Sequence, residues 1–187
     1  MRDQVRGALF NILGAEALEG ARVLDLFAGS GSLGIEALSR GAASAVFVER
    51  EPACLEVLRQ KLSALGLGAG PRAVPVRHDL SLGLDALAGR GPFDLVLMHP
   101  PFAVLRTAPG PGEADVERLL RELAGSSALL TAASSSRGGG LVAFETPREN
   151  WPDPADLSPL GLEVALRREY GSTALFVARR PARIASG

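Results

Sequence analysis

Residues 22–34 read Arg-Val-Leu-Asp-Leu-Phe-Ala-Gly-Ser-Gly-Ser-Leu-Gly, and this stretch decides the fold. The largely apolar run from Arg22 to Phe27 predicts a buried strand, and Gly29, Gly31 and Gly34 after it match the pattern Gly-x-Gly-x-x-Gly. Glycines at this spacing turn a strand sharply into a helix and let a ligand approach the backbone. The pattern predicts a nucleotide or nucleoside site, or else a tight turn without a ligand.

The alternation of helices and strands continues on both sides of this turn. Before it, an amphipathic helix is expected at 3–18, with Asp3 as its N-cap. After it, we expect helices at 35–41, 52–66, 81–88 and 113–123 and strands at 45–49, 73–77, 93–98 and 141–145. Such alternation predicts a mostly parallel sheet with right-handed connections.

The last part of the sequence predicts a hairpin. Strands expected at 163–170 and 173–179 are separated only by Gly171 and Ser172, and a two-residue connection favours antiparallel pairing. We therefore predict an α/β fold with a mostly parallel, seven-stranded sheet and an antiparallel C-terminal hairpin. Because no repeat or boundary divides the sequence, residues 1–187 are expected to form a single domain.

Composition and charge exclude several classes of protein. The 187 residues are 47% hydrophobic and 22% charged, which excludes a disordered chain. No apolar run reaches the ~20 residues of a membrane span, and a single cysteine, Cys54, excludes a disulfide framework or a cysteine-rich metal site. Lys and Arg number 20 against 21 Asp and Glu, so no global basic charge indicates a nucleic-acid partner. We expect a cytoplasmic, soluble monomer without metal or membrane partners.

An acid beside the glycines separates two candidate cofactors. Asp25 lies near the carboxyl end of the first predicted strand, where a carboxylate repels the pyrophosphate of NAD. The same carboxylate attracts the ammonium and sulfonium groups of S-adenosylmethionine. Glu49, at the end of the next strand, can accept from ribose hydroxyls. We favour S-adenosylmethionine over NAD, and the alternative role for Asp25 is that of a buried acid capping backbone amides.

A further acid follows the third predicted strand. Asp79 can accept from an adenine amino group while the backbone of Leu80 meets the ring, or it can cap a helix that starts near Ser81. The carboxyl ends of the first four predicted strands thus carry candidate polar groups. An open parallel sheet binds ligands at this edge.

The fourth predicted strand leads into Met98-His-Pro-Pro-Phe102, and here the sequence resembles the amino-group methyltransferases with an Asp/Asn-Pro-Pro-Phe/Tyr motif. Over residues 3–179 it is similar to the bacterial 16S rRNA guanine-N2 methyltransferase family. The other stretches that carry the resemblance are Asp3–Leu13 and Asp25–Gly41, with weaker ones at Val142–Glu145 and Tyr170–Thr173.

The resemblance implies a Rossmann-like methyltransferase fold and S-adenosylmethionine-dependent methyl transfer to the exocyclic N2 amine of a guanine in 16S rRNA or the assembling 30S subunit. The residues that it implies for the cofactor are Asp25, Phe27, Ala28, Gly29, Gly31, Glu49, Arg50, Asp79 and Leu80. It places the target base at Pro100, Pro101 and Phe102, with the Pro100 carbonyl accepting from the amine and Phe102 stacking on the base. Such groups orient an amine whose lone pair is delocalised into its ring.

His99 stands where this family has an acid. A neutral imidazole offers one acceptor nitrogen and a protonated imidazole offers none. His99 can therefore accept in place of the acid, serve as a base, mark an impaired site or be structural; we take it, with Pro100 and Phe102, as a candidate catalytic residue. Two alternative functions stay open: methyl transfer to adenine or cytosine amino groups in DNA, and cofactor and RNA binding with weak catalysis.

Positive charge for RNA binding has two expected sources. Family members usually carry a basic, glycine-rich extension before the first helix, whereas this sequence begins at that helix. A local basic face can serve instead, the alternative being scattered, solvated arginines. The candidates for such a face are Arg72, Arg77, Arg167, Arg168, Arg179, Arg180 and Arg183, with Arg2 and Arg6 nearby.

Overall fold

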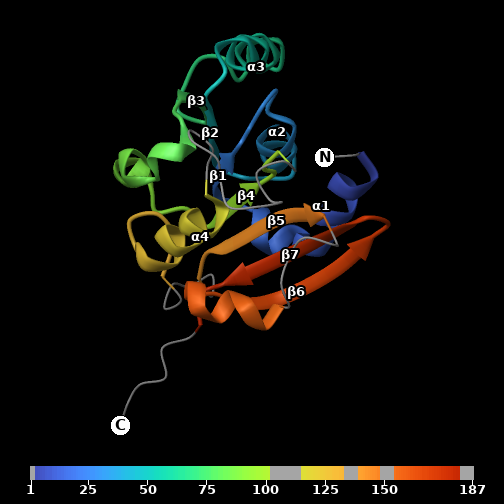
Figure 1. Cartoon of the computed structure of the whole chain (residues 1–187). Coiled ribbons are helices and arrows are strands. Elements are labelled where there is room, and N and C mark those ends of the chain that lie inside the picture. The colour runs from blue at the N-terminus through green and yellow to red at the C-terminus, as the bar shows by residue number, and fades with distance from the viewer. Residues whose placement is uncertain (1–2, 102–114, 133–138, 148–153, 182–187) are drawn as a thin grey trace.

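The computed structural model describes residues 3–101, 115–132, 139–147 and 154–181 (Figure 1). The helices among them are α1 (Asp3–Leu18), α2 (Ser32–Ser39), α3 (Pro52–Ala64) and α4 (Val116–Gly125). The strands are β1 (Arg22–Leu26), β2 (Ser44–Glu49), β3 (Ala73–Arg77), β4 (Leu95–Met98), β5 (Leu141–Pro147), β6 (Glu163–Tyr170) and β7 (Thr173–Arg179). Short 3-10 helices span Leu80–Leu82, Asp85–Arg90 and Pro154–Leu160.

The seven strands form one sheet in the order β3-β2-β1-β4-β5-β7-β6. All neighbouring pairs from β3 to β5 are parallel, while β7 is antiparallel to both β5 and β6. This confirms the predicted mostly parallel sheet with a C-terminal hairpin. Gly171, which has a φ of 61°, lies in the tight turn between β6 and β7. The hairpin folds back so that β7 inserts between β5 and the edge strand β6.

Helices cover both faces of the sheet, and the alternation of side chains along each strand supplies both cores. On one face, Val23 and Leu97 pack with residues of α1, α2 and α3. On the other, Leu26 and Met98 pack with α4 and the 3-10 helices (Figure 1). The central strands are therefore buried on both sides, which explains why their sequences are apolar runs rather than alternating patterns.

The predicted helices differ in detail from those of the structure, and α2 spans Ser32–Ser39 where 35–41 was expected. The helix expected at 81–88 is two 3-10 helices, because Gly83 between them has a φ of 86° that no helix continues through. Helix α1 has the predicted bounds but is kinked at Gly14, whose φ is 67°. Helix α4 begins at Val116, after Asp115 accepts at Oδ1 from the Arg118 N–H at 3.0 Å. The earlier start predicted at Glu113 lies outside the described residues.

The glycines of the first turn are needed for close packing as well as for backbone geometry. Gly31 has a φ of 82°, and a Cβ atom there would approach Leu58 Cδ1 to 2.3 Å. A Cβ atom on Gly34 would lie 2.3 Å from Cε1 of the fully buried Phe47. Helix α2 therefore packs against β2 at a distance that only glycine permits.

A substitution in α2 tests this packing. Gly34→Ala is expected to lower the free energy of unfolding by about 1–3 kcal/mol, because Phe47 must move in a filled core. Gly7→Ala is the matched control: Gly7 lies within α1 and has nothing within 4 Å of its Cβ position. Helix propensity predicts that this control gains up to about 1 kcal/mol. Urea unfolding measures both; equal stability gains would contradict the packing argument.

Candidate functional site

The β1–α2 turn has a backbone conformation that is energetically unfavourable for residues other than glycine. Phe27 has a φ of 60°, in the left-handed region, and Gly29 and Gly31 also have positive φ values, of 55° and 82°. Holding a non-glycine residue in this region costs on the order of 1–3 kcal/mol, and residues strained in this way cluster at functional sites. The Ala28 N–H donates to Val48 O at 3.0 Å, and the Gly31 N–H donates to Ala28 O at 2.8 Å. These bonds hold the turn at the carboxyl edge of the sheet.

Asp25 lies beneath this turn and is almost fully buried. Its Oδ2 accepts from the Gly34 N–H at 2.8 Å, so it caps a backbone amide as the structural alternative predicted. Burial raises the pKa of Asp25 to about 7; the Gly34 hydrogen bond opposes this rise, and the negative charge of Glu49 adds to it. A buried acid with this pKa is stabilised in its ionised form by a positively charged ligand.

Glu49 connects the turn to the following strand. Its Oε2 accepts from the Gly29 N–H at 2.8 Å, and its Oε1 accepts from the N–H groups of Arg50 and Glu51 at 2.8 and 2.9 Å. Each carboxylate oxygen has two lone pairs, so Oε2 keeps capacity to accept a hydroxyl. Three backbone bonds fix the orientation of this carboxylate. Arg50 takes part through its backbone, while its side-chain Nε lies 3.3 Å from Glu51 Oε1.

The third predicted cofactor segment forms a tight turn. Asp79 accepts at Oδ1 from the Ser81 N–H at 2.9 Å and thereby caps the 3-10 helix Leu80–Leu82. This bond and the side-chain bond to Ser81 lower the pKa of Asp79, so the group is ionised at neutral pH. The Leu80 side chain is buried in the core, which leaves its backbone as the part that can meet a ligand. The capping role predicted for Asp79 is confirmed.

Two side chains of helix α4 form hydrogen bonds with this segment, and the sequence analysis did not predict these contacts. Arg118 Nη2 donates to the carbonyls of Leu80 and Ser81 at 3.2 and 2.8 Å. Glu122 Oε2 accepts from the Leu84 N–H at 2.7 Å. The only sequence signal was an Arg–Glu pair one helical turn apart, and that spacing is equally common on solvent-exposed helix faces.

The motif after β4 brings His99 beside a second group that the sequence prediction left out. His99 Nδ1 lies 3.0 Å from Glu145 Oε2, and Glu145 lies near the carboxyl end of β5. Pro100 is buried and Pro101 is exposed, while Phe102 lies outside the described residues. The signal for Glu145 was its place near the end of the fifth predicted strand, at the ligand-binding edge.

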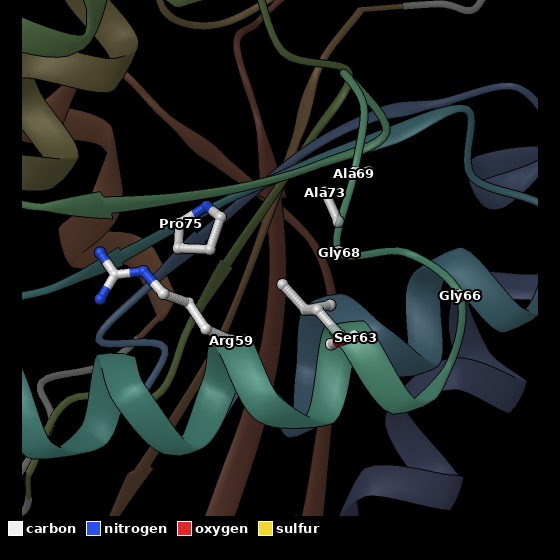
Figure 2. A pocket seen from close by; sticks show the side chains of 8 residues that line it. Arg59, Ser63, Gly66, Gly68, Ala69, Ala73 and Pro75 are labelled. Atoms are coloured by element: carbon white, nitrogen blue, oxygen red, sulfur yellow. The ribbon is translucent and has the colours of Figure 1, made fainter.

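A surface groove lies away from this edge. It runs between α3 and β3 and is lined by Arg59 and Ser63 on the helix, by Ala73 and Pro75 on the strand and by the loop 66–69 (Figure 2). That loop precedes β3, so the groove lies toward the amino ends of the parallel strands. The groove is therefore separate from the carboxyl-edge site, which comprises Asp25, Glu49, Asp79 and His99 at the carboxyl ends of the parallel strands.

The prediction that the arginines form a single basic face is wrong for those arginines that the structure describes. Arg72 and Arg77 flank or end β3 at one edge of the sheet, and Arg6 lies in α1. The other described candidates, Arg167, Arg168, Arg179 and Arg180, belong to β6, β7 and the residue after it. Two of these are paired with acids: Arg167 with Glu169 at 2.8 Å and Arg179 with Glu163 at 2.6 Å. The sheet order separates the two groups. Arg2 and Arg183 lie outside the described residues.

Two further findings concern the described part of the chain. Within it, no group of three or more His, Cys, Asp or Glu side chains is arranged to hold a metal ion. None of its helices combines the length and apolar character that crossing a membrane requires.

The sheet order and the carboxyl-edge site define the Rossmann-like methyltransferase fold. The chain belongs to the family named Conserved hypothetical protein 95, whose sequence profile matches residues 1–178. This confirms the resemblance seen in the sequence.

Individual relatives agree with this assignment. The chain is 40% identical over 101 residues to the Bacillus subtilis protein "Putative rRNA methyltransferase YlbH", covering 54% of this chain and 53% of that protein. It is 43% identical over 101 residues to "Ribosomal RNA small subunit methyltransferase D" of Escherichia coli K12, covering 54% and 48%. The matched stretch thus spans about half the length of these curated relatives. The solved structure "Putative methyltransferase yhhF from Escherichia coli" superposes with a TM-score of 0.72 at 32% identity, over 97% of this chain and 89% of that one.

The pKa of Asp25 makes a prediction about stability. Folding raises the pKa from 3.8 to about 7, so between these pH values the folded protein binds a proton that the unfolded chain has released. The contribution of Asp25 to the free energy of unfolding therefore falls as the pH rises, by at most about 1.4 kcal/mol per pH unit. Asp25→Asn keeps an acceptor for the Gly34 N–H without the charge. It is expected to be more stable than the wild type above pH 7, with the difference shrinking toward pH 4.

Thermal and urea unfolding from pH 4 to pH 8 measure this difference. Asp85→Asn is the control, because Asp85 is an exposed acid whose replacement is expected to change stability little at any pH. A constant difference between Asp25→Asn and the wild type across this range would contradict the assignment.

Proposed function

We propose that the chain acts as one domain that transfers a methyl group from S-adenosylmethionine to the exocyclic N2 amine of a guanine in 16S rRNA. The observation that carries the proposal is the set of acids at the carboxyl edge: Asp25 under the glycine turn and Glu49 bound to the turn's backbone. The family and its rRNA-methyltransferase relatives support the substrate class. His99, Pro100 and Pro101 follow the end of β4 at the same edge.

The residues present fit this cofactor better than they fit a dinucleotide. A buried Asp25 with a pKa of about 7 is stabilised in its ionised form by an ammonium or sulfonium group, whereas a pyrophosphate would repel it. Glu49 Oε2 retains capacity for a ribose hydroxyl, and the Asp79–Leu80 turn offers polar backbone and carboxylate groups to an adenine ring. When bound, S-adenosylmethionine supplies an electrophilic methyl group.

The segment after β4 would position the target base. In our proposal the Pro100 carbonyl accepts from the amine, Pro101 contacts the base, and Phe102 stacks on it. An acceptor and a stacking face hold the amine lone pair in one direction, and such positioning accounts for much of the rate enhancement in reactions of this kind. The base must leave its stack to reach the edge of the sheet, and stacking on an aromatic ring offsets part of that cost.

A binding experiment tests the cofactor assignment. Isothermal titration calorimetry of the wild type is expected to show binding of S-adenosylmethionine and none of NAD. Glu49→Gln removes a charged acceptor and is expected to weaken binding at least about tenfold. Glu163→Gln is the matched control, because Glu163 lies on the edge strand and pairs with Arg179. Absence of binding to folded wild-type protein, checked by circular dichroism, would contradict the proposed function.

A transfer experiment tests the substrate. Protein is incubated with methyl-labelled S-adenosylmethionine and with 30S particles, naked 16S rRNA or duplex DNA, and the nucleosides are separated by mass spectrometry. The expected product is N2-methylguanosine from the ribosomal substrates alone. Methylated adenine or cytosine from DNA would support the alternative substrate, and no transfer despite cofactor binding would support a binding protein instead.

A further inference from the structure

His99 and Glu145 occupy matched positions on neighbouring parallel strands. Met98 pairs with Phe144 in the β4–β5 register. The residues that follow them, His99 and Glu145, therefore point to the same side of the sheet. The 3.0 Å contact between His99 Nδ1 and Glu145 Oε2 is the result. The Glu145 side chain is 3% exposed and that of His99 is 27% exposed, so the imidazole lies between a buried carboxyl group and the surface.

Nδ1 and Oε2 lie at ion-pair distance without the angles of a regular hydrogen bond, and this proximity bears on where the imidazole carries its proton. A buried carboxylate requires a donor, because its desolvation is otherwise uncompensated. At 3.0 Å a lone pair on Nδ1 would repel the carboxylate oxygen, so the distance favours the neutral imidazole with its proton on Nδ1 and its lone pair on Nε2. A carboxylate that fixes the tautomer of a histidine in this way also stabilises the imidazolium ion that forms when Nε2 takes a proton.

The other histidine of the chain is held in the opposite way. His78 Nε2 lies 2.7 Å from the Gly83 carbonyl, which can only accept, so His78 carries its proton on Nε2. The contacts of the two histidines in the chain thus favour opposite tautomers. His78 serves as an internal reference for His99.

We propose that His99 and Glu145 together replace the acid of the amino-methyltransferase motif, an inference that rests on the proposed function. As the amine nitrogen forms its bond to the methyl carbon, the carbon–sulfur bond breaks and its electron pair stays on sulfur. The nitrogen releases one N–H proton, and Nε2 of His99 accepts it. His99 is the catalytic residue, and Glu145 is a positioning residue that acts through it.

The tautomers are tested on the folded wild-type protein without any ligand. Long-range ¹H–¹⁵N spectra at pH 8 are expected to show His99 protonated at Nδ1 and His78 protonated at Nε2. Glu145→Gln is expected to move His99 off the Nδ1 tautomer and to leave His78 unchanged, while Glu163→Gln changes neither. His99 protonated at Nε2, or on both nitrogens, in the wild type would overturn the proposal. This outcome does not depend on any variant folding.

Kinetics separate this inference from the proposed function. With methyl transfer to 30S particles as the assay, His99→Ala is expected to lower kcat about 100-fold and Glu145→Gln about tenfold, with KM for the particles unchanged. Both variants are expected to bind S-adenosylhomocysteine as the wild type does. Wild-type activity in His99→Ala would overturn the inference alone. A wild type that transfers no methyl group would overturn the proposed function, whatever tautomers the spectra show.

Discussion

A single hydrogen bond between a buried carboxyl group and a backbone amide underlies the site. Asp25 accepts from the Gly34 N–H at 2.8 Å and so ties the end of β1 to the first turn of α2. The chain between them must then reverse within a few residues, which requires the left-handed conformation of Phe27 and the positive φ values of Gly29 and Gly31. The strain of the turn is a consequence of this constraint, whereas the raised pKa of Asp25 comes from its burial, which the Gly34 hydrogen bond opposes.

The parallel sheet brings the other functional groups to the same edge. Because neighbouring strands run in the same direction, Glu49 at the end of β2, Asp79 after β3 and His99 after β4 lie at one edge of the sheet. Glu145 lies near the same end of β5. Backbone N–H groups fix the orientation of the Glu49 and Asp79 carboxylates. The edge is therefore acidic and preorganised, which suits a positively charged nucleoside ligand.

Much of the fold could be predicted because its signals are local. The apolar strands, the glycine turn and the two-residue hairpin connection each depend on a few adjacent residues. The pairing of His99 with Glu145 could not be predicted, because it depends on the register of β4 against β5. The hold of Arg118 on the Leu80 carbonyl likewise depends on how α4 packs on the sheet. The prediction of one basic face was wrong because the sheet order places β3 and β6 at opposite edges. Residue types along the sequence do not reveal that order.

The most direct measurement is a crystal structure of the protein with S-adenosylhomocysteine. The ligand is expected to lie across the carboxyl ends of β1, β2 and β3, with its amino group toward Asp25 and a ribose hydroxyl donating to Glu49 Oε2. The N–H of Gly29 should still donate to that carboxylate. A ligand bound in the groove between α3 and β3, or at the edge without contact to Asp25 and Glu49, would contradict the proposed cofactor site.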